Sequence, residues 1–361
     1  MTKQESETAA AGTVRVETRA TRWAIAVFAL TAVGTGILHA GERVPLAGPD
    51  SIGTLAAWFA AGFAAASFGG SLWLEERLGH VPWRARLPLA KRIVDALATT
   101  LAMGMLAYLM VIAIAQLFQL GFRGLTVDPY GGGVLAGAAA AAVSYAAALA
   151  GARVTSSGLA TLATLGLFMG TMASMLSSPD ESWWQLHFSQ LGNTDGITGY
   201  RFNLALIITG LVLTVLANYI GHDLERGIAA RGASLPGLVA ALSWLFAGIG
   251  VLMMVVGLVP DAVNFAVHVG AASGMVVVFG AFAYVSLSRL PGVPREFTAF
   301  TAIVVLGIIA SVVLWIPIGY YNLTGMEFIA AGLLFAWLTV FVRMSAAYAL
   351  PTREIVEGAR A

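Results

Sequence analysis

The 361-residue chain contains no cysteine and few charged residues. Without cysteine, disulfides, thiolate metal sites and cysteine nucleophiles are excluded. Charged residues make up only 11% of the chain, whereas soluble domains carry about 25%, so the chain cannot cover a folded core with polar surface. A Walker A phosphate loop, a Gly-x-Ser-x-Gly elbow and a His-Glu-x-x-His zinc helix are also absent from the sequence. The chain is therefore not a P-loop ATPase, and it carries no familiar hydrolase motif.

Long apolar runs dominate instead, with 58% hydrophobic residues and a mean hydropathy of +0.82. A helix that crosses the hydrocarbon core of a bilayer needs roughly 20 apolar residues. Runs of this length do not alternate as barrel strands would, and a lone helix satisfies its own backbone hydrogen bonds in lipid. The sequence therefore predicts an all-α, polytopic integral membrane helical bundle of about ten transmembrane helices. The predicted segments are Trp23–His39, Ile52–Leu74, Ile93–Leu120, Val134–Gly151, Gly158–Leu176, Phe202–Gly221, Gly237–Val259, Val263–Leu287, Thr298–Ile318 and Phe328–Leu350.

The distribution of charge predicts the orientation of these helices. With the N-terminus in the cytoplasm, only Arg43, Arg123 and Arg201 of the 20 Lys and Arg residues fall outward, as the positive-inside rule requires. Both termini are then cytoplasmic. We expect the basic clusters to face anionic lipid rather than nucleic acid, and we place the protein in the cytoplasmic (plasma) membrane of a bacterium. The outward segments are acidic and contain Glu42, Asp50, Asp128, Asp180, Glu181, Asp195, Asp261 and Glu327.

The chain divides by composition into four predicted regions. Residues 1–22 are polar and predict a disordered cytoplasmic N-terminus, followed by a retained first helix, because the preceding stretch is too long and too acidic for a signal peptide. Residues 23–151 form a four-helix membrane block. Residues 158–350 form a six-helix core with an outward motif loop at 177–201, and residues 351–361 form a cytoplasmic tail. Small residues at four-residue spacing predict close helix packing, as at Gly62, Ala66 and Gly70, and again at Gly133, Gly137 and Ala141.

No charged residue falls near a predicted bilayer midplane, which argues against proton pumps and ion transporters. Polar residues gather instead at the outward side. The loop 177–201 is too apolar for an ordinary solvated loop, and Asp261, Asn264 and His268 share one face if the eighth helix begins at Val263. We therefore predict a cavity whose lining residues have hydrogen-bonding side chains, namely His187, Ser189, Gln190, Asn203, Asp261, Asn264 and His268.

Two interpretations of this cluster remain open at the sequence level. In the first, His187 and His268 are structural and tie the loop to neighbouring helices, because a polar group at that depth must be paired. In the second, the histidines and Asp261 form a functional cavity that acts as a proton switch, a metal site, a general base or a ligand site. We expect no catalytic residue, cofactor or resident metal.

The loop sequence His187-Phe188-Ser189-Gln190-Leu191-Gly192, followed by Phe202-Asn203, resembles the bacterial multi-pass membrane family called domain of unknown function 998. Asn264 and His268-Val269-Gly270 resemble the start of a later helix in that family. The resemblance covers about residues 158–350, and DRAM-like membrane proteins are more distantly similar. It implies a six-helix core with an outward motif loop, and it implies no established reaction.

These observations favour a protein without enzymatic activity, although they leave catalysis open. The leading hypothesis is that the outward cavity binds or senses a membrane lipid or small amphiphile, or that it scaffolds a membrane protein partner. One alternative is a permease for a neutral or lipidic substrate, which would require pseudo-symmetric halves and a midplane cavity. The other is an intramembrane hydrolase or transferase that uses the histidines and Asp261, which would require those side chains to converge.

Overall fold

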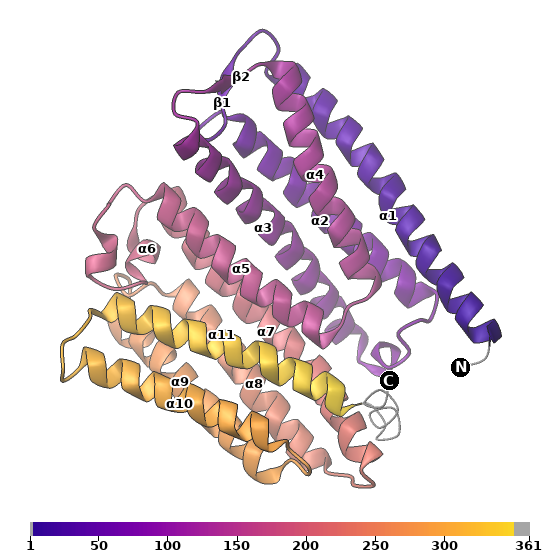
Figure 1. Ribbon diagram of the computed structural model, residues 1–361, viewed down its shortest axis with the longest axis vertical. Coiled ribbons are helices and arrows are strands. Elements are labelled where there is room, and N and C mark those ends of the chain that lie inside the picture. Colours follow the sequence, from indigo (N-terminus) through magenta and orange to yellow (C-terminus); the bar gives the residue numbers. More distant parts are fainter. Residues whose placement is uncertain (1–2, 350–361) are drawn as a thin grey trace. The chain divides into compact units, whose positions relative to one another are not determined.

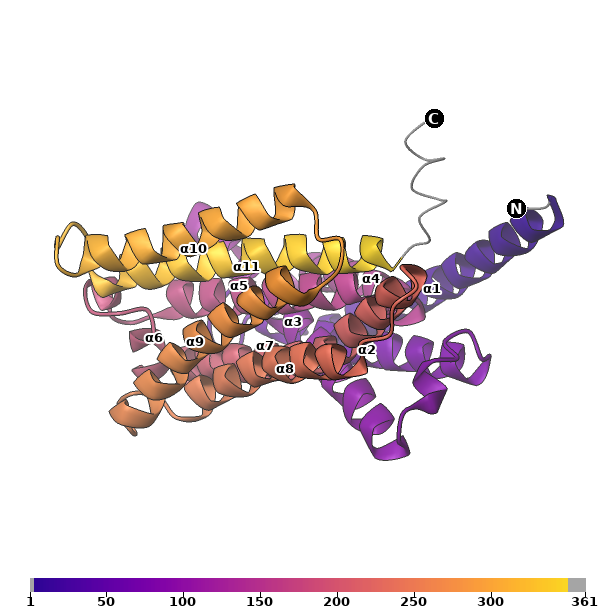
Figure 2. The same ribbon diagram turned by 90° about the horizontal axis from the view of Figure 1, so that it is seen from below.

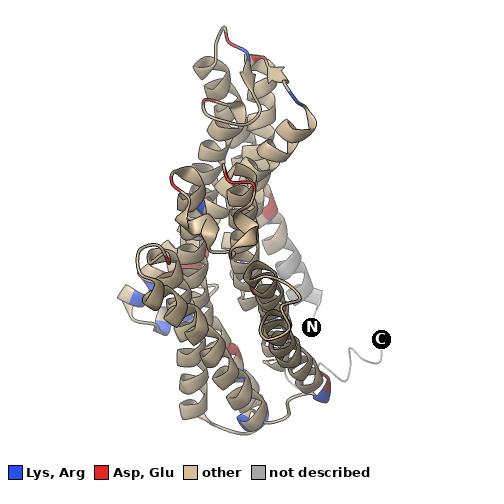
Figure 3. Ribbon diagram, turned by 90° about the vertical axis from the view of Figure 1, so that its left-hand side faces the viewer, with Lys and Arg blue, Asp and Glu red and all other residues tan. Residues whose placement is uncertain are grey.

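The computed structural model describes residues 3–349, and the predicted tail 351–361 lies outside this range. Ten helices in the described part are long and apolar enough to cross a membrane, so the predicted all-α membrane bundle is confirmed. Charged residues lie mostly at helix ends and in the connecting loops (Figure 3). The membrane-spanning helices (Figure 1) are α1 (Lys3–Leu38), α2 (Ile52–Arg77), α3 (Leu89–Gly121), α4 (Pro129–Ala152), α5 (Ser156–Ser177), α7 (Ile197–Ala230), α8 (Pro236–Leu258), α9 (Phe265–Arg289), α10 (Arg295–Trp315) and α11 (Leu323–Tyr348).

The N-terminal segment differs from the prediction, because α1 begins at Lys3 and leaves no disordered stretch in the described part of residues 1–22. Two contacts hold its polar turns. Glu17 accepts a hydrogen bond from the Tyr145 hydroxyl, and an Arg19 Nη2 lies 2.7 Å from an Oε1 of Glu75. The low hydropathy of the N-terminal turns of α1 therefore indicates a helix that extends beyond the hydrocarbon core, rather than a disordered segment.

Side-chain caps define where several helices begin on the predicted outward side. Ser51 accepts from the Thr54 amide at α2, and Asn322 accepts from the Gly325 amide at α11. Asp128 accepts from two amides at α4, where Pro129 occupies the first turn. Such residues satisfy amides that have no partner within the helix. Hydrogen bonding, chiefly by the Gly131 amide, holds the pKa of the Asp128 carboxyl below its usual value.

The chain forms two compact units, Met1–Val154 with Phe168–Leu176, and Thr155–Leu167 with Ser177–Ala361. In the first unit α4 packs against both α1 and α2, while the strands β1 (Val44–Pro45) and β2 (Thr126–Val127) pair antiparallel. The glycine spacing on α4 predicts this packing: a Cβ on Gly133 would lie 2.6 Å from the carbonyl oxygen of Ala32, and one on Gly137 would lie 2.9 Å from that of Phe28.

The corresponding stripe on α2 is open, so the close packing predicted there is wrong. A Cβ built on Gly62 or Gly70 would have no described atom of another helix within 4 Å. The spacing of small residues indicates where a partner can approach closely, but it does not supply the partner.

In the second unit α7 packs on α8, α8 on α9, and α11 on both α10 and α7. Helices α10 and α11 lie side by side in two perpendicular views (Figure 2). Gly210 and Gly250 bring α7 and α8 together, since a Cβ on Gly210 would lie 2.4 Å from the carbonyl oxygen of Gly250. The core is aromatic: the Trp337 ring stacks on Phe341, and its Nε1 donates a 2.9 Å hydrogen bond to the Thr301 hydroxyl.

Candidate outward-facing polar site

The segment between α5 and α7 is a compact structure rather than an open loop. It contains a 3-10 turn, η2 (Trp183–Gln185), and a single helical turn, α6 (Gln190–Asn193). Leu191 and Gly192 are buried, and the Asn203 side-chain amide donates a 2.9 Å hydrogen bond to the carbonyl oxygen of Gly192. A Cβ on Gly192 would lie 2.5 Å from the Asn203 Oδ1, so a larger residue here would displace the Asn203 side chain. Asn203 therefore shapes the loop from the first turns of α7.

Aromatic contacts hold the loop against α7 and α11. Phe188 lies edge-on to Trp183 with ring centroids 5.6 Å apart, and it also contacts Phe202 and Phe328 at centroid distances of 6.1 Å. Trp183 is buried, whereas Trp184 is 52% exposed. The two tryptophans therefore differ: one belongs to the protein interior and the other is available to the membrane interface.

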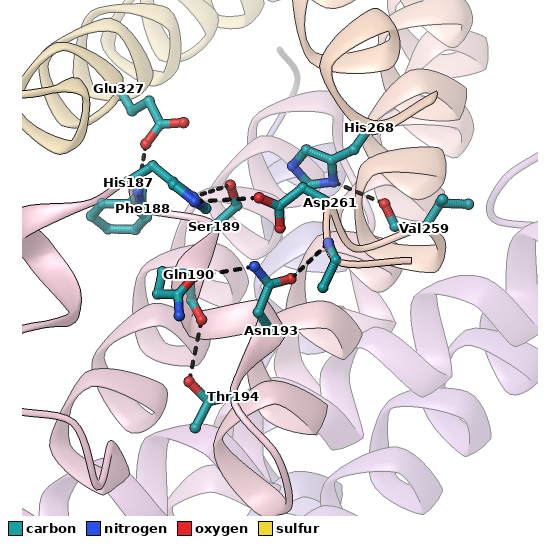
Figure 4. A network of polar contacts seen from close by, with 11 residues as sticks. His187, Phe188, Ser189, Gln190, Asn193, Thr194, Val259, Asp261, His268 and Glu327 are labelled. Carbon is teal, nitrogen blue, oxygen red and sulfur yellow. Dashed lines mark hydrogen bonds and ion pairs between the residues drawn. The ribbon is translucent and has the colours of Figure 1, made fainter. Parts of the chain in front are cut away.

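The central feature of the site is a set of polar groups from three segments (Figure 4). His187 Nε2 lies 3.3 Å from Asp261 Oδ2, and its Nδ1 lies 3.1 Å from the Ser189 hydroxyl oxygen. The next backbone amide, that of Phe188, donates a hydrogen bond to an Oε2 of Glu327 in α11. Two carboxylates thus approach consecutive residues of the loop. We call His187, Ser189, Asp261 and Glu327 the outward cluster.

Two further hydrogen bonds join the loop to its surroundings, and a third lies within the loop. Asn193 accepts a 3.3 Å bond from the Ala262 amide and donates a 3.2 Å bond to the Gln190 side chain. Asn322, before α11, donates a 2.6 Å bond to the carbonyl oxygen of Trp184. The loop is thereby fixed to the α8–α9 turn and to the start of α11, which favours a single conformation of the outward cluster.

Four of the seven predicted lining residues lie outside this cluster, namely Gln190, Asn203, Asn264 and His268. His268 is 6% exposed, and its Nδ1 is 2.8 Å from the carbonyl oxygen of Val259, so it ties α9 to the end of α8. Asn264 is exposed and caps α9, where it accepts a 3.1 Å bond from the Val267 amide. Helix α9 therefore begins at Phe265, and Asp261 lies in the preceding turn rather than on a shared helical face.

The electrostatics of the outward cluster are dominated by its carboxylates. The Asp261 side chain is 12% exposed, and its Oδ1 is buried with no hydrogen-bond partner among residues 3–349. A buried carboxylate oxygen without a donor is costly, so the arrangement favours a donor or a cation at that point. Among the described residues, no group of three or more His, Asp or Glu side chains is arranged to hold a metal ion.

Sequence reasoning missed Glu327, Asn193 and Asn322 as members of this network. Glu327 is separated from Phe188 by 139 residues, and Asn322 from Trp184 by 138. The available signal was weak: Glu327 is an outward acidic residue one turn into an apolar helix, a position at which a carboxylate requires a partner.

Comparison with known proteins gives no relative of this chain. No protein-family model matches it, and no curated protein or solved structure is significantly similar to it. The resemblance to domain of unknown function 998 and to DRAM-like proteins stays a prediction, which rests on the 187–192 and 202–203 segments and on Asn264 and His268-Val269-Gly270. The assignment of function therefore depends on the geometry of the site.

Proposed function

We propose that this polytopic helical membrane protein binds, at the outward cluster of its second unit, a membrane lipid or small amphiphile that carries a protonated amine. The proposal rests on one observation: the buried Asp261 Oδ1, which has no donor among residues 3–349. An ammonium group would supply the missing donor, and charge-assisted hydrogen bonds of this kind are the strong ones. In this proposal the protein acts by binding and not by catalysis.

The surroundings of Asp261 support an amphiphilic ligand. Glu327 adds a second carboxylate. Within residues 3–349, its one hydrogen-bond donor is the Phe188 amide. Apolar side chains lie on the same segments, since Val263 is 74% exposed and Phe328 is 65% exposed. A site that combines anionic oxygens with exposed apolar residues suits a molecule whose head is cationic and whose tail remains in the lipid.

His187 shares the carboxylate that would bind the ligand. Its Nε2 lies 3.3 Å from Asp261 Oδ2, whereas Oδ1 is the oxygen without a donor among residues 3–349. The two oxygens of Asp261 could therefore bind the imidazole and the ammonium group at the same time.

The test is a binding comparison on the full-length protein in detergent micelles. Dodecylamine should raise Tm, and dodecanol, which has the same chain and no charge, should not. Asp261→Asn should weaken amine binding by at least about tenfold, because a hydrogen bond to a charged group contributes roughly 1.5–3 kcal/mol. Asp195→Asn is the matched control, since Asp195 is an exposed carboxylate of the 177–201 loop that lies outside the outward cluster. Equal responses to the amine and the alcohol, or equal losses in the two variants, would reject the proposal.

A second candidate is supported by the order Ser189, His187, Asp261. With the imidazole proton on Nε2 and directed at Asp261, Nδ1 is free to accept the Ser189 hydroxyl proton, as a general base does for a serine nucleophile. An acyl transferase or hydrolase would use this arrangement. Covalent labelling by a fluorophosphonate probe that disappears in Ser189→Ala but persists in Ser182→Ala would support catalysis, and an absence of labelling in the wild-type protein would remove it. No contact among residues 3–349 favours the permease alternative.

A further inference from the structure

A second site is present in the first unit, far along the sequence from the outward cluster. A cavity of about 720 Å3 opens between α1 and α2, a volume within the range of small-molecule sites. It lies where the N-terminal half of α1 meets the C-terminal half of α2, which is the side that the charge distribution predicts to be cytoplasmic. Its lining residues are Val14, Arg15, Thr18, Arg19, Arg22, Trp23, Ala66, Ser67, Gly70, Ser71 and Ala148.

The packing of α4 explains why this groove exists. Helix α4 contacts α1 and α2 extensively, whereas α1 and α2 contact each other little (Figure 1). Small residues allow α4 to approach both neighbours: a Cβ on Gly137 would lie 2.9 Å from the Phe28 carbonyl oxygen, and one on Gly151 would lie 2.3 Å from the Phe68 carbonyl oxygen. The two helices thus pack on a common partner, and the space between them is left open with Ala148 in its lining.

One wall of the groove is strongly basic. Arg15, Arg19 and Arg22 are spaced at i, i+4 and i+7, so they lie along one face of α1, and no acidic residue is among those lining the groove. Arg19 is held in place by Glu75, whose Oε1 lies 2.7 Å from its Nη2. The three arginines lie within about two helical turns before Trp23, where the apolar run of α1 begins. This is the depth at which a transmembrane helix meets lipid headgroups.

The opposite wall is uncharged and consists of the small residues Ala66, Ser67, Gly70 and Ser71 of α2. Gly70 and Ala66 expose the surface of α2, and a Cβ built on Gly70 would meet no described atom within 4 Å beyond its own helix turn and chain neighbours. The Trp23 indole, which donates its N–H to the Ser67 hydroxyl, borders the groove at the same level. The groove therefore offers cationic groups at one end and open apolar surface beside them.

We propose that this groove is a binding site for an anionic phospholipid of the cytoplasmic leaflet. The phosphate would lie against the guanidinium groups of Arg15, Arg19 and Arg22, and an acyl chain would follow the open face of α2. Charge complementarity identifies the ligand: basic pockets between transmembrane helices on the cytoplasmic side suit anionic headgroups, and arginine binds phosphate through paired hydrogen bonds. A zwitterionic lipid would bind less well, because its own cationic group would be repelled by the three arginines.

The charge of the site is tested by native mass spectrometry of the full-length, delipidated protein. The probes are phosphatidylglycerol and phosphatidylcholine with identical acyl chains. The wild-type protein should prefer phosphatidylglycerol, and Arg15→Gln/Arg22→Gln should bind it roughly 30-fold more weakly, a change equivalent to about 2 kcal/mol for two guanidinium groups. Arg86→Gln/Lys91→Gln removes two exposed charges from the same side outside the groove and should bind like the wild type. Equal losses in the two double variants would overturn the proposal.

The shape of the site is tested separately with all charges retained. Gly70→Phe fills the groove and should remove one bound phosphatidylglycerol, whereas Gly280→Phe, at an equally open and exposed glycine of α9, should not. Glycerol 3-phosphate, which has the head but no acyl chain, should not displace the lipid. Binding of glycerol 3-phosphate as tight as that of the lipid would identify a free phosphate site, and full lipid binding by Gly70→Phe would place the lipid elsewhere; either result would overturn the proposal.

Discussion

A double-mutant cycle on His187 and Asp261 tests the central contact of the outward cluster. The two side chains are 22% and 12% exposed, and their nearest nitrogen and oxygen are 3.3 Å apart. At this distance and an effective dielectric constant of about 20, the gross attraction between full charges is roughly 5 kcal/mol. Desolvation of both groups cancels much of it, and directly contacting pairs show coupling energies of about 0.5–3 kcal/mol. We expect a coupling near 1.5 kcal/mol.

The two single variants should be unequal. His187→Ala leaves the Asp261 carboxylate buried without its contact to the imidazole, whereas Asp261→Ala also removes the Oδ1 that has no partner among the described residues. Removing one member of a buried pair costs most when it strands the other, so His187→Ala should be the more destabilising change. The assay is reversible unfolding of the full-length protein in mixed micelles, with the free energy of unfolding measured for the wild type, both single variants and the double variant.

A second cycle supplies the comparison. His268 bonds the carbonyl oxygen of Val259 rather than any group of the outward cluster, so His187→Ala and His268→Ala should add within about 0.5 kcal/mol. A coupling below about 0.3 kcal/mol between His187 and Asp261 would refute the contact. A coupling above about 1 kcal/mol between the two histidines would refute their assignment to separate partners.

Three other changes probe helix packing in the second unit and helix capping in the first. Gly210→Val should cost at least about 2 kcal/mol in unfolding free energy, because its Cβ would meet the Gly250 carbonyl oxygen at 2.4 Å. Trp337→Ala should cost about 3 kcal/mol by emptying the aromatic core and leaving the Thr301 hydroxyl without its donor; unchanged unfolding would contradict that packing. Asp128→Ala should lower Tm at neutral pH by removing the α4 cap, whereas Asp128→Asn should not. Because the folded-state pKa of Asp128 lies below its usual value, the stability from this cap should be lost only as the pH falls below about 4, which a Tm series in acid would show.

The membrane spans were predictable because a single property determines them. Apolar length is a local feature of sequence, and the capping residues Ser51, Asp128 and Asn322 are local as well, since each caps amides two or three residues ahead. The sequence did not indicate that Glu17 and Arg19, in the N-terminal turns of α1, have partners on other helices. The polarity of these residues indicates only that they lie outside the hydrocarbon core. Whether they form a helix depends on contacts with other helices, which the local sequence does not show.

The site was less predictable, for a related reason. The apolar character of the 177–201 loop showed that it would fold against the protein, and His187 with Asp261 was a sound candidate pair. The sequence did not show that Glu327 approaches from α11 or that His268 turns to Val259. The open stripe at Gly62 and Gly70 carries the same lesson, because small-residue spacing is identical whether or not a second helix is present.

The bond between the Phe188 amide and Glu327 has a consequence for biogenesis. The acceptor is made 139 residues after the donor, when the intervening helices have already been threaded through the insertion machinery. Until α11 is synthesised, the Phe188 amide lacks this acceptor. Closing this end of the second unit is therefore a late step in maturation, and a nascent chain arrested before α11 should remain sensitive to proteases applied to the side that the charge distribution predicts to be outward.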